Sequence, residues 1–212
     1  AQRISQRSFI ELAKKKKAYM KTSPVLWCTE CQTSIAQAEL ETKECETVFN
    51  YLNFTTPIGN LLIATTRPEL LAGCACIFVH PDDTRYKKFI GQKAIVPLYD
   101  FEIPILADDT VAMDKGTGVV MCASFGDSAD VEWYQKHKLT SKEVILADGT
   151  ISEKIDFIGK MTVKKARAYI IELLKKQNLL VKQETIRHMV AVHERCQHEV
   201  EFIMSKQWYI DV

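Results

Sequence analysis

Five short runs rich in β-branched and aromatic residues follow one another between residues 48 and 106. Gly, Pro and Asp separate them at intervals of roughly a dozen residues, which is the spacing of strands joined by turns. This pattern predicts a barrel or a sandwich rather than βαβ units. The runs read VFNYLNF, NLLIAT, CACIFVH, KAIVPL and FEIPIL, and a sixth strand, GTGVVMC, is predicted after Asp114.

The first part of the chain and the segment after the strands carry signals for helix starts. Ser8 followed by Glu11 is typical of a capping box, and it predicts a helix that runs to about Met20. Pro24 then directs the chain into an extended segment. Asp127 is placed to cap a short helix after the last of the β-rich runs.

The second half of the chain predicts one more helix and several extended segments. Asp148 and Gly149 are typical of a hairpin turn. Thr162 precedes a helix that ends near Asn178 and whose apolar stripe is formed by Ala166, Ile170, Ile171 and Leu174. Residues 179–212 are predicted to be mostly extended. The fold class expected is therefore mostly β with helices, an α+β fold.

Composition is that of a globular protein that buries a core. The chain has 212 residues, of which 47% are hydrophobic and 26% charged, and its net charge is +1. A near-neutral chain has no global field that indicates nucleic-acid binding, so such a partner would need local patches. No apolar run has the length needed to span a bilayer, and the start lacks a signal-peptide pattern. We expect a cytoplasmic monomer without membrane contact.

Two cysteine-containing motifs of equal spacing lie near opposite ends of the chain. Cys28 and Cys31 form a C-x2-C motif, and His193 and Cys196 form an H-x2-C motif about 160 residues later. Three thiolates and one imidazole make a ligand set for tetrahedral zinc. His198 is an alternative to His193. If the two motifs meet, a structural zinc ion holds the ends of a large insertion together; otherwise these are ordinary thiols in extended segments.

A loop and a helix start place small and acidic residues close together in the sequence. Gly116 and Gly118 flank Thr117 and allow the backbone to approach a ligand closely. Asp127 and Asp130 are three residues apart at the start of the predicted helix, so both can point to one side. One carboxylate can cap the helix while the other faces a cleft and holds an ammonium group. Capping and surface charge alone would explain the same pattern.

Four motifs together resemble the editing domain of class I aminoacyl-tRNA synthetases, the large insertion of the valine, isoleucine and leucine enzymes. They are TTRPE at 65–69, HPDD at 80–83, GTGVV at 116–120 and D-x2-D at 127–130. The resemblance covers almost the whole chain. It implies a β-barrel-like editing domain at residues 47–185. It also implies a small stem with the zinc motifs, formed by residues 1–46 and 186–212.

Within that family, the chain looks most like the valine enzymes. TTRPELL followed by FVHPDDTRY carries this similarity, and the two flanks of the chain resemble the beginning and end of the valine insertion. Met121, Ala123 and the segment 124–127 depart from the commonest bacterial pattern, in which a Lys and a Thr occupy the first two positions. An aromatic-Gly-Asp segment here is more similar to the archaeal branch. The departure leaves the roles of that Lys and Thr unassigned.

The resemblance implies a reaction and a set of site residues. The reaction is hydrolysis of the ester of Thr-tRNA(Val), because an apolar pocket rejects threonine weakly in favour of valine, for which the valine enzymes are a known example. Thr65 and Thr66 would bind the attacking water and the terminal ribose, and Asp130 would hold the substrate ammonium. The residues expected to contact substrate or tRNA are Arg67, at the terminal phosphate or adenosine, and Glu69, Gly116, Thr117, Gly118, Val119 and Asp127.

The same resemblance sets the partners and the alternatives. The partners implied are the acceptor end of tRNA(Val) and the remainder of the synthetase, since the HIGH and KMSKS signatures of the synthetic site are missing. No cofactor is expected for ester hydrolysis. The alternatives are an isoleucine- or leucine-type editing domain and a non-catalytic tRNA-binding module. A zinc hydrolase is disfavoured, because four protein ligands leave no position for water.

Overall fold

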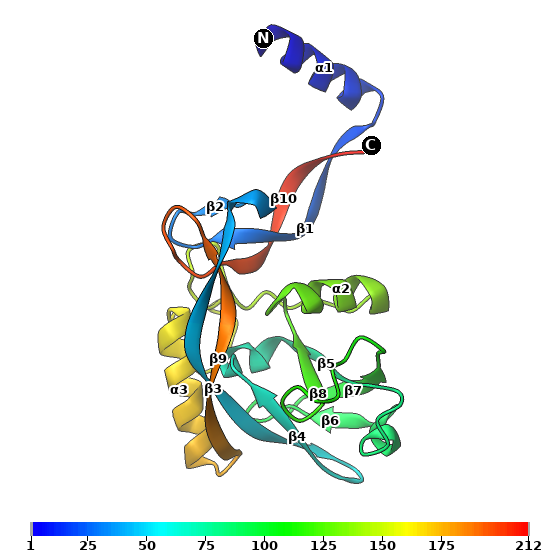
Figure 1. Cartoon of the computed structure of the whole chain (residues 1–212), viewed down its shortest axis with the longest axis vertical. Coiled ribbons are helices and arrows are strands. Elements are labelled where there is room, and N and C mark those ends of the chain that lie inside the picture. Colours follow the sequence, from blue (N-terminus) through cyan, green and yellow to red (C-terminus); the bar gives the residue numbers. More distant parts are fainter. Residues whose placement is uncertain (1, 212) are drawn as a thin grey trace.

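The computed structural model describes residues 2–211 and contains two β-sheets joined by a long two-stranded ribbon (Figure 1). The larger sheet has seven strands in the order β4-β3-β6-β7-β5-β8, with β9 paired along β3. All its neighbouring pairs are antiparallel except β5 and β7. Its strands are β3 (Leu40–Thr56), β4 (Gly59–Thr65), β5 (Cys74–Val79), β6 (Lys93–Ile95), β7 (Glu102–Ala107), β8 (Val119–Ala123) and β9 (Leu180–His193).

The smaller sheet contains the two ends of the chain. Its order is β10-β1-β2, formed by β10 (Glu201–Ile210), β1 (Ala18–Cys28) and β2 (Thr33–Ser34). β1 and β10 pair antiparallel from Ala18 opposite Ile210 to Trp27 opposite Glu201. The β3–β9 ribbon connects this sheet to the larger one, with Leu40 opposite His193 at the end nearer the small sheet. Residues near the two termini therefore lie on the same side of the molecule.

Within residues 2–211, three α-helices and three short 3-10 helices accompany the sheets. α2 (Ser128–His137) lies between the small sheet and the larger one, and α3 (Val163–Lys176) packs along the β3–β9 side. α1 (Gln2–Lys14) lies beyond the small sheet and has no buried residue. The 3-10 helices are η1 (Gln37–Glu39), η2 (Pro68–Gly73) and η3 (Lys87–Phe89).

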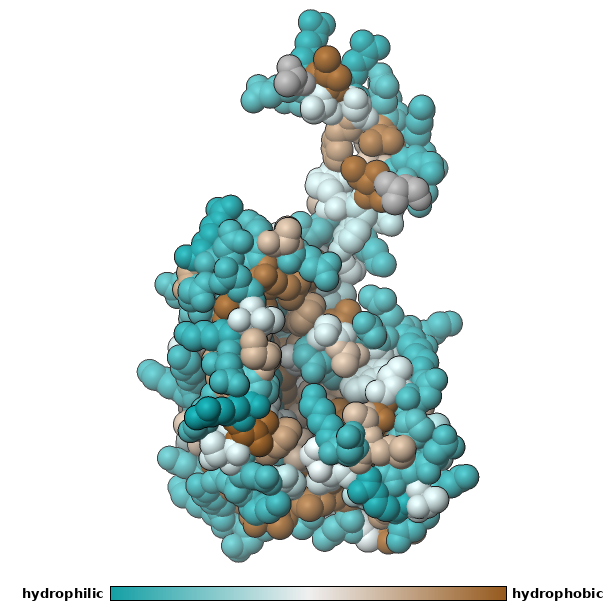
Figure 2. All heavy atoms as spheres, in the orientation of Figure 1, coloured by the Kyte–Doolittle hydropathy of each residue, from teal (hydrophilic) through white to brown (hydrophobic). Residues whose placement is uncertain are grey.

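The main core lies inside the larger sheet and under α3. Its fully buried members include Leu52, Phe54, Leu61 and Ile63 from the β3–β4 hairpin, and Ile170 comes from α3. Burial of this apolar surface is the main stabilising contribution to the fold. Figure 2 shows hydrophilic residues over most of the visible surface, with apolar residues in small patches both on this body and at the narrow end.

The structure confirms the mostly β class with helices and the barrel-like larger sheet. The six predicted strands are present, and the paired chain ends form the separate small sheet. The predicted boundaries at residues 46/47 and 185/186 stay a prediction, because β3 and β9 run through both without interruption. No helix between residues 2 and 211 has the length and apolar character needed to cross a membrane.

The prediction for the first helix was wrong at both ends. The helix begins at Gln2 and ends at Lys14, so Ser8 lies inside it and caps nothing. Met20 is a strand residue that faces Trp208 across the β1–β10 pair. Pairing with a distant strand outweighs local helix propensity in this segment. The other helix starts were predicted correctly, since α2 follows Asp127 and α3 follows Thr162.

Candidate functional site

A cavity of about 320 Å³ lies between the end of β4, the start of β8 and the start of α2. Its volume is at the lower end of the range for small-molecule sites, which is about 300–1,000 Å³. The lining combines polar groups with apolar side chains such as Met121 and Ala123. The predicted site residues among the lining are Thr65, Thr66, Arg67, Gly116, Val119, Asp127 and Asp130.

The two aspartates lie at the start of α2 and form a reciprocal cap. Asp127 Oδ1 accepts a hydrogen bond from the backbone N–H of Asp130 at 3.1 Å. Asp130 Oδ2 accepts from the backbone N–H groups of Gly126 at 2.8 Å and of Asp127 at 3.2 Å. Asp127 is exposed, whereas Asp130 is buried. Both residues line the cavity and both take part in the cap, while their separate roles toward a substrate stay a prediction.

Burial makes Asp130 an unusual carboxylate. Removal from water raises its pKa, and the nearby charge of Asp127 raises it further, to about 7. Hydrogen bonds from the Cys122 thiol and from the backbone oppose this rise only in part. An ammonium group in the cavity would stabilise the charged form and lower the pKa again. A carboxylate so poised is typical of functional sites.

Thr65 ends β4 and Thr66 follows it, and both residues line the cavity. Thr65 is buried, and its Oγ1 accepts a hydrogen bond from the backbone N–H of Arg67 at 3.1 Å. The amide of Asn50 donates to the carbonyl oxygen of Thr65 at 3.2 Å and so fixes the strand end. Pro68 starts η2 directly afterwards, which turns the chain away from the strand. The hydroxyls of Thr65 and Thr66 thus belong to a rigid edge of the cavity.

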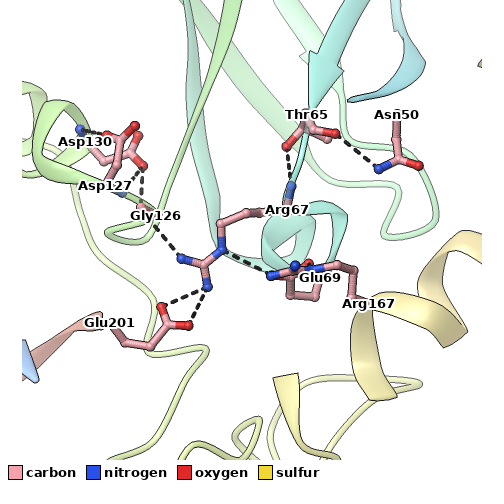
Figure 3. A network of polar contacts seen from close by, with 9 residues as sticks. All are labelled: Asn50, Thr65, Arg67, Glu69, Gly126, Asp127, Asp130, Arg167 and Glu201. Carbon is pink, nitrogen blue, oxygen red and sulfur yellow. Dashed lines mark hydrogen bonds and ion pairs between the residues drawn. The ribbon is translucent and has the colours of Figure 1, made fainter. Parts of the chain in front are cut away.

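Arg67 is already paired on several sides (Figure 3). Its Nη2 donates to both carboxylate oxygens of Glu201 at 2.8 and 2.9 Å, and its Nη1 donates to the carbonyl oxygen of Gly126 at 3.1 Å. Nε donates to Glu69 Oε1 at 3.1 Å. Burial alone would lower the pKa of Arg67, but Glu201 and Glu69 raise it above its ordinary value. The Arg67 side chain is 20% exposed, and its guanidinium is permanently charged.

Glu69 does not reach the cavity. Its side chain is fully buried and accepts two hydrogen bonds from Arg167 of α3, both at 2.9 Å, besides the one from Arg67. Glu69, Glu201 and the two arginines thus form a charge-balanced network inside the protein. The structure places Glu69 as a link between η2 and α3, and its predicted contact with substrate or tRNA stays a prediction without support from this geometry.

The loop before β8 has a backbone conformation and a close packing that require glycine at position 118. Gly118 has φ +80°, and a Cβ there would lie 2.6 Å from the carbonyl oxygen of Met113. Arg85 donates to that same carbonyl oxygen and is paired with Asp83. Gly116 and Val119 line the cavity, while Thr117 and Gly118 lie outside its lining. The HPDD segment therefore supports the GTG loop and does not enter the site.

A second polar network holds α2 over the cavity. Trp133 Nε1 donates to Thr110 Oγ1 at 2.9 Å, and Thr110 donates to Asp108 at 2.5 Å. His137 at the other end of the helix lies 2.6 Å from the same carboxylate. Burial by itself would raise the pKa of Asp108, but hydrogen bonds from His137, Thr110 and Lys136 hold it below the ordinary value. Trp133 and Thr110 both line the cavity.

Away from the cavity, the two cysteine-containing motifs meet. Cys28, Cys31, His193 and Cys196 place their ligand atoms within 4.8 Å of one another. The sulfurs of Cys28 and Cys196 are 3.5 Å apart, and His193 Nδ1 lies 3.5 Å from Cys31 and 3.4 Å from Cys196. Tetrahedral zinc with bonds of about 2.0–2.3 Å implies ligand separations of about 3.3–3.8 Å. His198 is exposed, so His193 completes the group.

Two of the thiols have shifted pKa values. The pKa of Cys31 is raised to about 11, first by its contacts with Cys196 and Cys28. A hydrogen bond from the backbone of His198, followed by other contacts, lowers the pKa of Cys196 to about 7. A cation between the sulfurs would favour the thiolate form of Cys31, whose pKa is raised in its absence. This Cys3His group can bind a structural metal.

Comparisons with known proteins agree with this geometry. A sequence family described as "Leucyl-tRNA synthetase, editing domain" matches residues 82–169. The valine--tRNA ligase of Rickettsia canadensis (strain McKiel) is 44% identical over 99% of this chain. That of Haloarcula marismortui is 40% identical over the whole chain. The chain belongs to the editing domains of the class I aminoacyl-tRNA synthetases. It spans 26% and 24% of the length of these two relatives.

A solved structure supports the fold of this editing domain. The LeuRS of Agrobacterium radiobacter K84 agnB2, solved as a ternary complex with tRNA and LeuAMS, matches with a TM-score of 0.52. The match covers 95% of this chain and 33% of that chain, at 15% identity. The shared architecture thus extends beyond residues 82–169, which the sequence family matches, toward the two chain ends.

Several residues that shape the site were not found from the sequence. Glu201 and Arg167, the partners of Arg67 and Glu69, lie about a hundred residues or more away in the chain. No local motif marks either of them. Asp108 and Thr110 follow a predicted strand, and a polar pair at a strand end was the available signal for them. His137 had no such signal, since a lone histidine near a helix end is common.

Proposed function

We propose that this editing domain hydrolyses the ester of threonine mischarged onto tRNA(Val). The observation that carries the proposal is the buried carboxylate of Asp130 in a cavity that Thr65 and Thr66 also line. A carboxylate that is buried but fixed by backbone N–H groups is suited to hold an ammonium group. The whole-chain similarity to valine--tRNA ligases supports valine as the amino acid of the parent enzyme.

The cavity suits a small amino acid that has both a methyl and a hydroxyl group. Met121 and Ala123 supply apolar contacts, while Asp127 and Thr66 supply groups that can bond to a hydroxyl. A site that hydrogen-bonds a substrate hydroxyl rejects an analogue without it more strongly than an apolar pocket rejects an added hydroxyl. Met121 and Ala123 stand where the commonest bacterial pattern has a Lys and a Thr, and neither side chain is a strong hydrogen-bond partner for a hydroxyl. We therefore assign recognition of the threonine hydroxyl to Asp127.

Hydrolysis needs a positioned water and no covalent intermediate. Water attacks the ester carbonyl, the bond to the ribose oxygen breaks, and threonine and the free tRNA end are released. Thr65 and Thr66 orient the water and the terminal ribose, whose neighbouring hydroxyl assists proton transfer. Positioning supplies much of the acceleration, because an aminoacyl ester is already reactive. Gly116 and Val119, which line the cavity, offer backbone for the terminal adenosine.

The partners proposed are the acceptor end of tRNA(Val) and the remainder of a synthetase. Arg67 lies on the cavity wall, but its pairing with Glu201 leaves little of the guanidinium for a phosphate. The Cys3His group is proposed to bind zinc, which would hold the β1–β2 turn to the end of β9. The metal would be held by residues at the ends of β1 and β9 and in the turns that follow them, none of which lines the cavity, so ester hydrolysis does not require it.

The proposal is tested by incubating the chain with Thr-tRNA(Val), Val-tRNA(Val) and Val-tRNA(Ile) and following the loss of each ester. We expect the threonyl ester on tRNA(Val) to be cleaved at least tenfold faster than the others, as loss of a hydroxyl leaves polar groups unpaired. Preferential cleavage of Val-tRNA(Ile) would instead indicate an isoleucine-type domain. Salt-sensitive tRNA binding without cleavage would indicate a binding module.

A further inference from the structure

Arg67 connects the small sheet to the cavity (Figure 3). Glu201 is the first residue of β10, and its carboxylate is bonded through both oxygens to one nitrogen of the Arg67 guanidinium. The second terminal nitrogen of the guanidinium donates to the carbonyl oxygen of Gly126. Glu201 is only 8% exposed, so this ion pair is shielded from water and from salt. The guanidinium therefore bridges two segments that are far apart in the sequence.

Gly126 connects Arg67 to Asp130, the candidate ammonium anchor. Its carbonyl oxygen accepts from Arg67 at 3.1 Å, and its own N–H donates to Asp130 Oδ2 at 2.8 Å. A Cβ at Gly126 would lie 2.8 Å from that same Oδ2 atom, which shows how closely the backbone and the carboxylate approach. Two residues thus separate the carboxylate of Glu201 from that of Asp130.

Glu69 keeps Arg67 from rotating out of this arrangement. It bonds to Nε of Arg67 and is itself held by two hydrogen bonds from Arg167. Glu201 does not line the cavity. The lining includes Arg67, Gly126 and Asp130, but it includes neither Glu69 nor Glu201. A role for Glu201 in the reaction would therefore be exerted through Arg67.

We propose that Glu201 is a positioning residue of the site. It holds Arg67 against Gly126, and Gly126 in turn sets the place of the Asp130 carboxylate in the cavity. The proposal deepens the editing function and rests on it for the identity of the substrate. It gives Arg67 a positioning role instead of the phosphate contact that the family resemblance implied. It also couples the small sheet to the cavity, since Glu201 lies opposite Trp27 of β1.

The test compares Glu201→Gln with Glu201→Asp and with Glu199→Gln as a matched control. Glutamine keeps the shape of the side chain but removes its charge, and aspartate keeps the charge. Glu199 lies two residues away and is exposed. Two readouts are taken: hydrogen exchange of the Gly126 amide by NMR, and the KM and kcat for deacylation of Thr-tRNA(Val). Exchange of the Trp133 indole N–H reports on the other network under α2.

In Glu201→Gln we expect Gly126 to exchange about tenfold faster, with Trp133 unchanged, because the loop opens locally. KM for the threonyl ester should rise about tenfold while kcat changes less, as expected when a binding contact is displaced. Glu201→Asp should lie closer to the wild type, and Glu199→Gln should match it. Unchanged exchange at Gly126 in Glu201→Gln would overturn the proposal. Equal acceleration at Gly126 and Trp133 would also overturn it, by showing a general loss of structure.

The two readouts separate this inference from the proposed function. If the wild-type chain cleaves no threonyl ester, the editing proposal fails. The exchange comparison still decides whether Glu201 holds the Gly126 loop, because it requires no substrate.

Discussion

The metal group and the cavity are both assembled from distant segments, but they differ in how strictly the chemistry limits their residues. Cys28, Cys31, His193 and Cys196 have few uses other than binding a metal together at this spacing. The cavity is lined by common polar residues, and a residue such as Arg67 can contact either a ligand or another side chain. A metal group is therefore easier to identify from sequence than the division of roles within a cavity.

The largest effect is expected from disrupting the metal group. Structural zinc contributes its binding free energy to folding, so Cys28→Ser should destabilise the small sheet by more than about 5 kcal/mol when zinc is present. Thermal unfolding and metal content measured by mass spectrometry check this. Cys45→Ser is the matched control, since Cys45 lies on β3 outside the group. Equal stability and equal metal content of the two variants would show that no metal binds there.

Removing Arg67 should have the next largest effect. Arg67→Ala leaves Glu69 and Glu201 buried with one fewer cation, and breaking a buried ion pair from one side costs about 3–5 kcal/mol. Chemical denaturation of the variant measures this loss. A residue that served only to bind tRNA would leave stability unchanged when replaced. A stability change below about 1 kcal/mol would thus indicate that Arg67 serves to bind a ligand and not to hold the ion-pair network together.

Asp130→Asn should stabilise the protein at neutral pH. The folded state raises the pKa of Asp130 to about 7, so the folded state binds its proton more tightly than the unfolded state does. Stability from this group is then lost as pH rises from the ordinary value near 3.8 to about 7. We expect the variant to gain about 1–3 kcal/mol relative to the wild type at pH 7.5 and little at pH 4. Denaturation at both pH values measures the difference.

The opposite pH trend would contradict this account of Asp130. If the wild type were the more stable protein at pH 7.5, the charged carboxylate would have a cationic partner inside the fold, besides the backbone N–H groups of Gly126 and Asp127. Asp130 would then be a structural residue and not the group that binds the substrate ammonium.

His198→Ala should have the smallest effect. The side chain of His198 is exposed, while its backbone carbonyl oxygen accepts from the N–H of His193 and its backbone also bonds to the Cys196 thiol. Metal content should be unchanged, and stability should change by less than about 0.5 kcal/mol. His193→Ala, by contrast, should lose the metal. Loss of metal in His198→Ala would show that the assignment between the two histidines is wrong.

Particular residues show where sequence reasoning succeeds on this fold. Strand positions were predicted because apolar runs and turn residues are local signals, and the cap at Asp127 follows from the D-x2-D spacing. The first helix was predicted too far along the chain because the pairing of β1 with β10 joins residues that are nearly 200 positions apart. The partners of Arg67 and Glu69 were hidden for the same reason. Burial, which raises the pKa of Asp130, likewise depends on the whole fold.

The measurement that tests the central claim most directly is single-turnover deacylation of Thr-tRNA(Val) by Asp130→Ala beside the wild type. Glu172→Ala, an exposed position on α3, is the control. If Asp130 holds the substrate ammonium, its loss should slow cleavage by about a hundredfold or more, while the control retains the wild-type rate. Wild-type rates in Asp130→Ala would contradict the account and place the editing chemistry outside this cavity.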